Sequence, residues 1–256
     1  MGYVFDYKDA LTYERWFYSP KNRNAAEQEA RLVFDMLKPG RGRELLDIGC
    51  GTGARLADFV EKGLNVSGVD PSPFMLDICR EKFQNRVEYF RNYGEDLPFE
   101  DNAFHYSTLI TTLEYVDDAS KVIQEACRVT KDRIFIGIYN RYSVTWVRRR
   151  IKAVFSDSIY RHACFYSVWD IKQLVRNSVG NVPVAWKTVC RVPEYFKKTP
   201  FQVKDAVIIR KIPVGSFAGI VVSPVPRLRT TPLALKYDSK HSAAPGIQPL
   251  KLNGPP

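Results

Sequence analysis

The stretch ELLDIGCGTGARL, residues 44–56, places three glycines on alternate positions directly after a short apolar run. Glycine weakens a strand, so Gly49, Gly51 and Gly53 indicate a backbone path that side chains would block. An apolar strand followed by a glycine turn and then a helical pattern is typical of a ligand-binding βα turn. The stretch therefore predicts a ligand site at the end of a buried strand.

The sequence on either side of this stretch alternates between short apolar runs and helical patterns. Strands are predicted over 43–48, 65–70, 86–90, 104–110, 132–139, 184–190 and 216–222. Helices are predicted over 24–38, 54–63, 73–83, 118–130, 143–155 and 167–180, the first of them capped by Asn24. This order predicts an α/β fold, doubly wound, with a mostly parallel seven-stranded sheet and helices on both faces. In such folds the ligand binds at the carboxyl ends of the strands, where the glycine turn lies.

The composition excludes several other classes of protein. The chain has 256 residues, of which 45% are hydrophobic, and no apolar run reaches the length of a membrane-spanning helix. The five cysteines are scattered without a CxxC pair, so neither a metal site nor a disulfide framework is predicted. The first residues lack the pattern of a signal peptide. We therefore expect a cytoplasmic location.

Three signals bear on which nucleotide the glycine turn binds. Asp47 stands two residues before Gly49, where a negative charge disfavours the diphosphate of a dinucleotide and suits a cationic ligand. Asp70 ends the next predicted strand, where a carboxylate can accept hydrogen bonds from a ribose diol. The third signal is GEDLPFEDNAF, residues 94–104, between the third and fourth predicted strands.

Together these residues resemble the class I S-adenosylmethionine-dependent methyltransferases, specifically the type 11 group that includes the ubiquinone-biosynthesis methyltransferases. LLDIGCGTG (45–53) matches the cofactor loop of that group, and GVDPSPFML (68–76) matches its ribose strand and the start of the next helix. EDLPFEDNAF (95–104) matches the stretch beside the adenine, and LITTLEYVDD (109–118) matches the segment after the fourth strand. The resemblance implies a Rossmann-like methyltransferase fold with S-adenosyl-L-methionine as the methyl donor.

The resemblance also implies which residues bind the cofactor. They are Asp47, Gly49, Cys50, Gly51, Thr52, Gly53, Asp70, Pro71, Ser72, Tyr93, Gly94, Glu95, Asp96, Leu109 and Ile110. Asp47 is expected on the ammonium side, Asp70 at the ribose hydroxyls, and residues 93–96 beside the adenine. Leu109 and Ile110 are expected along the route to the sulfonium. The group usually carries Asp where Tyr93 stands, which makes a backbone contact to the adenine the expected substitute.

The same resemblance suggests a lid and a substrate cover. Residues 1–40 are expected to form N-terminal helices and a lid, and residues 41–222 the methyltransferase domain. Within it, a substrate cover is expected around 141–180, and 191–215 form a long connection between the last two strands. The candidate lid and substrate residues are Tyr13, Trp16, Tyr115 and His162. Residues 223–256 are rich in Pro, Gly and Ser, which predicts a mostly disordered tail.

The charge is unevenly distributed along the chain. Residues 1–140 carry a net charge of −5 and residues 141–256 a net charge of +15, which together give the +10 of the whole chain. The predicted helix 143–155 combines an apolar face with four cations, which indicates peripheral contact of 141–176 with an anionic membrane. Steering of an acidic acceptor and an ordinary solvated face remain alternative explanations.

No catalytic residue is predicted, because displacement at a sulfonium needs alignment and exclusion of water more than a base. The stretch after the fourth predicted strand lacks the aromatic-proline motif of many base-methylating enzymes, so a nucleic acid acceptor is disfavoured. The acceptor is therefore expected to be a small organic or lipid-like molecule. Two alternatives stay open. One is a non-catalytic cofactor-binding or interaction protein, and the other is a nicotinamide-dependent oxidoreductase, because residues 49–54 also fit GxGxxA.

Overall fold

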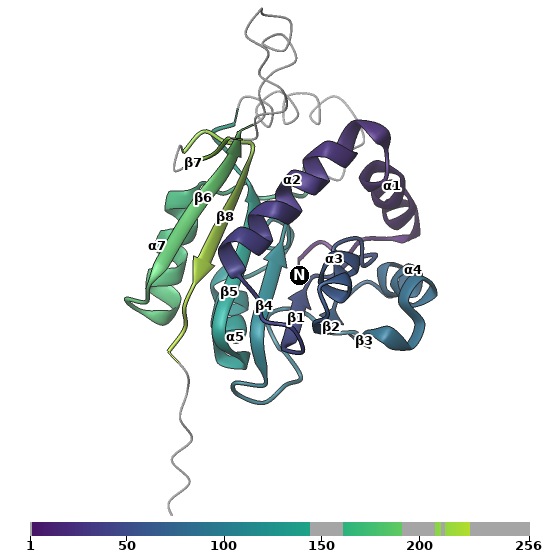
Figure 1. Cartoon of the computed structure of the whole chain (residues 1–256), viewed down its shortest axis with the longest axis horizontal. Coiled ribbons are helices and arrows are strands. Elements are labelled where there is room, and N and C mark those ends of the chain that lie inside the picture. Colours follow the sequence, from purple (N-terminus) through teal and green to yellow (C-terminus); the bar gives the residue numbers. More distant parts are fainter. Residues whose placement is uncertain (1, 144–160, 191–207, 211–212, 226–256) are drawn as a thin grey trace, which may run out of the picture.

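The computed structural model describes residues 2–143, 161–190, 208–210 and 213–225 of the chain. Within these ranges an eight-stranded sheet lies between two layers of helices (Figure 1). The predicted helix 143–155, most of the connection 191–215 and the tail from 226 onward lie outside the described residues.

The sheet brings the ends of several strands to one edge. Its strands are β1 (Glu44–Ile48), β2 (Asn65–Val69), β3 (Glu88–Phe90), β4 (Phe104–Ile110), β5 (Thr130–Tyr139), β6 (Val184–Cys190), β7 (Ile208–Arg210) and β8 (Phe217–Val222). Their spatial order is β3-β2-β1-β4-β5-β8-β6-β7, and the first five in this order are parallel. Strand β8 runs antiparallel to β5 and β6. The carboxyl ends of β1, β2 and β4 therefore meet beside the glycine turn.

The predicted fold class is confirmed, with one additional strand. All seven predicted strands form, most of them within two residues of their expected bounds. Strand β7 lies inside the predicted 191–215 connection and pairs antiparallel with Thr188–Cys190 of β6. The sheet thus has eight strands instead of seven, because part of the long connection extends the sheet at this edge.

Helices cover both faces of the sheet, as Figure 1 shows. Helices α2 (Pro20–Leu37), α3 (Leu56–Glu61) and α4 (Pro73–Phe83) cover one face, and α5 (Ala119–Val129) and α7 (Val168–Val179) cover the other. Strand alternation divides the core between them, since Leu45 packs with the first group while Leu46 and Ile48 pack with the second. Helix α1 (Tyr7–Phe17) lies against α2 and α4, beyond the end of β1.

Two boundaries differ from the sequence prediction for local reasons. Helix α2 begins at Pro20, after Ser19, and not at the predicted cap Asn24. Proline is well suited to the first helical turn, where its missing N–H costs nothing, so the helix extends four residues further back. Strand β3 begins at Glu88 because residues 84–86 form a 3₁₀ turn after α4. Within the described ranges, every helix is too short or too polar to span a lipid bilayer.

Candidate functional site

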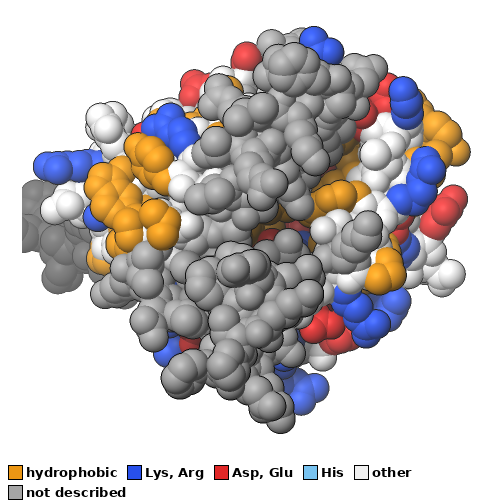
Figure 2. Space-filling model, turned by 90° about the horizontal axis from the view of Figure 1, so that it is seen from above, with side chains coloured by type: hydrophobic (Ala, Val, Ile, Leu, Met, Phe, Trp, Pro, Cys, Tyr) orange, Lys and Arg blue, Asp and Glu red, His pale blue; other side chains and the backbone are white. Residues whose placement is uncertain are grey.

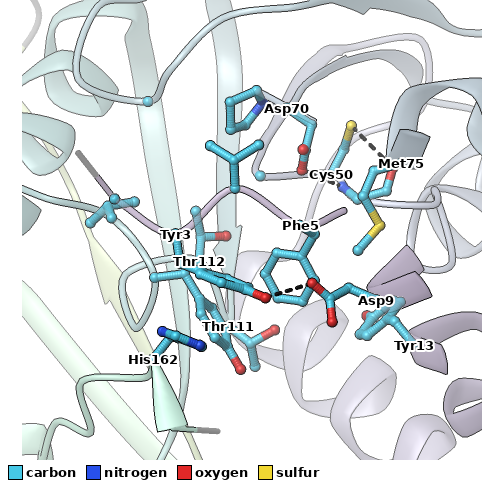
Figure 3. A pocket seen from close by; sticks show the side chains of 18 of the residues that line it. Tyr3, Phe5, Asp9, Tyr13, Cys50, Asp70, Met75, Thr111, Thr112 and His162 are labelled. Carbon is cyan, nitrogen blue, oxygen red and sulfur yellow. Dashed lines mark hydrogen bonds between the residues drawn. The ribbon is translucent and has the colours of Figure 1, made fainter. Parts of the chain in front are cut away.

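A cavity of ≈ 490 Å³ opens at the carboxyl edge of the parallel strands (Figure 3). Its walls come from the glycine turn, the loops after β2, β3 and β4, the end of β5, and the N-terminal residues. Thirteen of the predicted site residues line it, namely Tyr13, Trp16, Gly49, Cys50, Gly51, Asp70, Pro71, Tyr93, Gly94, Glu95, Ile110, Tyr115 and His162. The structure therefore brings most of the predicted cofactor and lid residues to one cavity.

The three glycines of the turn, which we call the cofactor loop (residues 49–53), have different roles. All three have positive φ angles, of 75°, 55° and 72°. A Cβ on Gly49 would lie 2.4 Å from the Thr112 side chain, and one on Gly53 would lie 2.5 Å from the Cys79 sulfur. A Cβ on Gly51 would meet only the Met75 sulfur, at 3.8 Å, on the cavity side. The first and third glycines thus permit close packing, while the second leaves backbone accessible to a ligand.

Asp70 connects the cofactor loop to the end of β2. Its carboxylate accepts a hydrogen bond from the Gly51 N–H and another from the Ser72 N–H, both at 2.9 Å. Burial raises the pKa of Asp70 to about 6, although the two N–H donors favour the charged form. The carboxylate also lines the cavity, as Figure 3 shows. Asp70 therefore caps its own turn and presents an acceptor for hydroxyl groups at the same time.

Asp47 lies beneath the cofactor loop and not among the residues that line the cavity. It is 3% exposed, and its carboxylate accepts a hydrogen bond from the Thr108 hydroxyl at 2.5 Å. Burial raises the pKa of Asp47 to about 7. A contribution to the cofactor's ammonium group would therefore act through the field or through an intervening group.

The loop after β3 lines the other end of the cavity with Asn92, Tyr93, Gly94 and Glu95. The Glu95 carboxylate accepts hydrogen bonds from the N–H groups of Asp117 and Asp118, at 3.0 and 3.3 Å, and so anchors the start of α5. Gly94 is buried, and a Cβ there would lie 3.2 Å from Ile48.

Six predicted residues lie outside the cavity wall. They are Asp47, Thr52, Gly53, Ser72, Asp96 and Leu109. Leu109 is fully buried in the core shared with α5, because successive strand residues point to opposite faces and Ile110 takes the cavity side. Ser72 caps α4 by accepting the Met75 N–H, and Asp96 is exposed. The buried Thr52 hydroxyl has no hydrogen-bond partner among the described residues.

Residues 2–6, which we call the N-terminal strap, cross the cavity without having been predicted to do so. The Tyr3 N–H donates to the carbonyl of Tyr115 at 2.8 Å, and the Ser72 hydroxyl donates to the carbonyl of Phe5 at 2.6 Å. The Tyr3 hydroxyl donates to the Asp9 carboxylate at 2.6 Å, the bond drawn in Figure 3. The strap is therefore attached to the two sides of the cavity and to α1.

Aromatic side chains form the wall farthest from the Asp70 carboxylate. The ring of His162 stacks on that of Tyr3, with centroids 4.1 Å apart and planes 7° from parallel. Phe5 makes an edge contact with Tyr115 at 5.0 Å. Tyr13 and Trp16 reach the same cavity from α1, and Tyr139 reaches it from the end of β5. This wall suits a flat or apolar molecule beside the cofactor.

The backbone after β4 is held in an unusual conformation at this wall. Thr111 has a φ of 56°, a left-handed conformation that costs a side-chain-bearing residue about 1–2 kcal/mol. The Thr111 N–H donates to the carbonyl of Gly137, and the Thr112 hydroxyl donates to the carbonyl of Ile48. Both threonines line the cavity. Their residue type gave no sequence signal, because threonine is ordinary at the end of a strand.

Glu114 fastens three segments behind the aromatic wall. Its side chain is 2% exposed and accepts the Tyr139 N–H at 3.0 Å, while its carbonyl accepts the Cys164 N–H at 2.7 Å. The second carboxylate oxygen has no partner among the described residues. Burial raises the pKa of Glu114 to about 7. The residue therefore ties the β4 loop to β5 and to the segment that carries His162.

The observed features fit S-adenosylmethionine. Gly51 leaves backbone open on the cavity side, the Asp70 carboxylate is directed into the cavity, and Gly94 keeps the loop after β3 close to the sheet. These three features follow one another along the cavity in the order of β1, β2 and β3. An acidic residue beneath the loop, Asp47, agrees with a cationic ligand better than with a diphosphate.

Comparison with known proteins gives the same result. A methyltransferase domain family matches residues 46–135. An uncharacterized protein of Methanocaldococcus jannaschii is 33% identical over 179 residues, covering 68% of this chain and 78% of that protein. The demethylmenaquinone methyltransferase of Tropheryma whipplei is 36% identical over 142 residues, covering 50% of this chain and 59% of that enzyme. The chain thus spans less than two thirds of that second relative.

A solved structure extends the likeness to most of the fold. The crystal structure of an S-adenosylmethionine-dependent methyltransferase from Thermotoga maritima, described as a possible histamine N-methyltransferase, has a TM-score of 0.67 and 25% identity. The match covers 85% of this chain and 96% of that one. Sequence family, fold and cavity agree, and the chain belongs to the type 11 group of class I S-adenosylmethionine-dependent methyltransferases.

Proposed function

We propose that this protein transfers the methyl group of S-adenosylmethionine to a small organic or lipid-like acceptor with a flat or apolar body. One observation carries the proposal. A single cavity joins the open backbone of Gly51 and the Asp70 carboxylate to a wall of aromatic rings. The first part suits the donor and the second part suits an acceptor held beside it.

The cofactor-holding residues would act through position and hydrogen bonding. Gly51 would let the methionine and ribose portions lie against the loop, and Asp70 would accept the ribose hydroxyls. Tyr93, Gly94 and Glu95 would flank the adenine, with the backbone in place of the carboxylate that the group usually has at position 93. Asp47 would favour the positive end of the cofactor from beneath the loop.

The acceptor would lie among Tyr3, Phe5, Tyr115, Tyr139 and His162. Aromatic rings stack with flat molecules and give apolar ones a large contact area, while their polar atoms orient a hydroxyl or amino group. Demethylmenaquinone, the acceptor in the name of one relative, combines a ring with a lipid-like chain. A base within a nucleic acid fits less well, because the segment LITTLEY after β4 lacks the aromatic-proline motif.

The bound cofactor supplies a methyl group that is activated by a positively charged sulfonium. The chain's own residues then align the acceptor and exclude water, which are the main requirements of in-line displacement. The N-terminal strap and the rings of Tyr13 and Trp16 cover the cavity for this purpose. Where the acceptor must lose a proton, His162 is the wall residue whose side-chain type accepts one near neutral pH.

An acceptor screen tests the proposed function. Purified protein with a radiolabelled methyl donor would be offered quinols, catechols, aromatic amines and short lipids, and label in the extracted product would be counted. We expect label in at least one ring-containing acceptor, and its loss in Asp70→Asn. Asp77→Asn, an exposed position on α4, is the matched control and should retain the activity. Label transferred equally by wild type and Asp70→Asn would contradict the assignment of Asp70 to the site.

We also propose a cytoplasmic protein that makes salt-sensitive contact with anionic membranes through its basic 141–176 region. Arg161, Lys172 and Arg176 are exposed in the described part of that region, whereas Arg141 pairs with Asp170 at 2.7 Å. On the face seen in Figure 2, acidic and basic side chains of the described residues are interspersed. The proposal therefore depends on the predicted helix 143–155. Equal sedimentation with neutral and anionic liposomes at low salt would contradict it.

A further inference from the structure

Lys82 joins the cofactor loop to the helix that covers the cavity. It lies in the last turn of α4, and its ammonium group is 2.6 Å from the Glu14 carboxylate of α1 and 3.0 Å from the carbonyl of Thr52. The same ammonium lies 5.1 Å from the centre of the Tyr18 ring. One side chain thus contacts the cofactor loop and both the body and the end of α1.

The pair is shielded from water more than a surface ion pair. The Lys82 and Glu14 side chains are 24% and 22% exposed. The second carboxylate oxygen of Glu14 and the hydroxyl of Thr52 are both buried without a partner among the described residues. Glu14 therefore depends on Lys82 for compensation of its charge, and loss of that partner would favour movement of the carboxylate into water.

Helix α1 has little else to hold it in place. Of its eleven residues only Ala10 is buried, and the helix packs on α2 and α4 at its margins. It nevertheless carries Tyr13 and Trp16 to the cavity, and Asp9 at its start holds the strap through Tyr3. A contact that fixes α1 therefore also fixes the covering side chains.

We propose that Lys82 is a positioning residue that couples the cofactor loop to closure of α1 over the cavity. The inference rests on the proposed cofactor site, since the loop must be the part that a ligand orders. When the loop is held, the Thr52 carbonyl fixes the Lys82 ammonium, which in turn holds Glu14 and α1. When the loop is free to move, the same contact transmits that freedom to the lid.

Hydrogen exchange with and without S-adenosylhomocysteine tests this coupling. In the wild type, the ligand should slow exchange of residues 7–17 together with the cofactor loop. In Lys82→Met, which retains the length of the side chain, the ligand should still bind and protect the loop. Its protection of residues 7–17 should fall about fivefold, the scale of one partly buried ion pair. Arg80→Met on the same helix, which removes only an exposed pair with Asp77, should behave as the wild type.

Two further variants keep the result specific. Glu14→Gln should reproduce the loss, and the double variant with Lys82→Met should add nothing, because both remove the same contact. Lys82→Arg should restore ligand-induced protection of the helix. Undiminished protection of residues 7–17 in both Lys82→Met and Glu14→Gln would overturn the proposal. Absence of ligand binding by the wild type would instead count against the cofactor site itself.

Discussion

The Asp70 carboxylate accepts a hydrogen bond from the Gly51 N–H at 2.9 Å, so the end of β2 and the cofactor loop are joined within the protein itself. Each of these residues also lines the cavity. The acceptor for a ribose and the open backbone for the rest of the cofactor are consequently held in a fixed relation. Preorganisation of this kind lowers the cost of ordering a site when the ligand binds.

The pKa of Asp70 predicts how cofactor binding depends on pH. Ribose hydroxyls donate to the carboxylate, so binding should favour its charged form, whose pKa in the folded protein is about 6. The affinity for S-adenosylhomocysteine should be constant between pH 7 and 8. It should fall by up to about tenfold per unit well below pH 6, as protonation competes with binding. Calorimetric titrations from pH 5 to 8 would measure this dependence.

Asp70→Asn provides the control for that pH dependence. It should bind the ligand more weakly at pH 8 and should lose most of the decline below pH 6. An unchanged decline in the variant would assign the titration to another group, such as Asp47.

The open side of Gly51 predicts a substitution that separates binding from folding. Gly51→Ala places a methyl group in a left-handed conformation, which should cost about 1–2 kcal/mol of the free energy of unfolding. The methyl group also points to the cavity, where the nearest atom is 3.8 Å away, so it should obstruct the cofactor. Denaturant unfolding and calorimetry on the same protein would give both quantities.

Gly42→Ala is a matched control for Gly51→Ala. Gly42 has a φ of 69° and would meet no atom within 4 Å, and it does not line the cavity. It should lose similar stability while retaining the affinity for S-adenosylhomocysteine. Equal affinities in the two variants would show that the cofactor does not approach Gly51.

The buried carboxylate of Glu114 predicts a stability that decreases with rising pH. Its pKa is about 7 in the folded protein and 4.5 in a model compound, so the folded state binds the proton more tightly. Stability from this group is present below pH 4.5 and is lost as the pH rises to 7, by at most about 3 kcal/mol. Glu114→Gln cannot ionise and should show a smaller loss of unfolding free energy between pH 5 and pH 8.

Urea unfolding at the two pH values measures this difference. Glu100→Gln, at an exposed position, should retain the wild-type dependence. Some decline should remain in Glu114→Gln, because burial also raises the pKa values of Asp47 and Asp70. The same decline in Glu114→Gln as in the wild type would refute the interpretation.

Local sequence patterns were sufficient to predict the sheet, the cofactor loop and Asp70, because each follows from a few neighbouring residues. Gly49 and Gly53 were recognised as glycines that a turn requires, and the structure adds that Thr112 and Cys79 fill the space beside them. Leu109 was expected at the cavity, but strand alternation directs it to the core. A short strand end gives little information about which of two neighbours faces the ligand.

The acceptor side was harder to predict because it is built from distant segments. Tyr3 and Phe5 show no periodicity, and their roles appear only through contacts with Tyr115 and Ser72. Asp9 looked like an ordinary acidic residue of a first helical turn, and Lys82 like an ordinary cation of a last one. Their contacts depend on how α1 and α4 pack, which no local pattern specifies.

The most direct test of the central claim is a calorimetric comparison of ligands. The wild-type protein would be titrated separately with S-adenosylhomocysteine and with NAD at pH 7.5, and Asp70→Asn and Asp77→Asn would be titrated in the same way. The account predicts binding of S-adenosylhomocysteine at one site per chain, weakened in Asp70→Asn but not in Asp77→Asn, and no binding of NAD. Binding of NAD without binding of S-adenosylhomocysteine would contradict it.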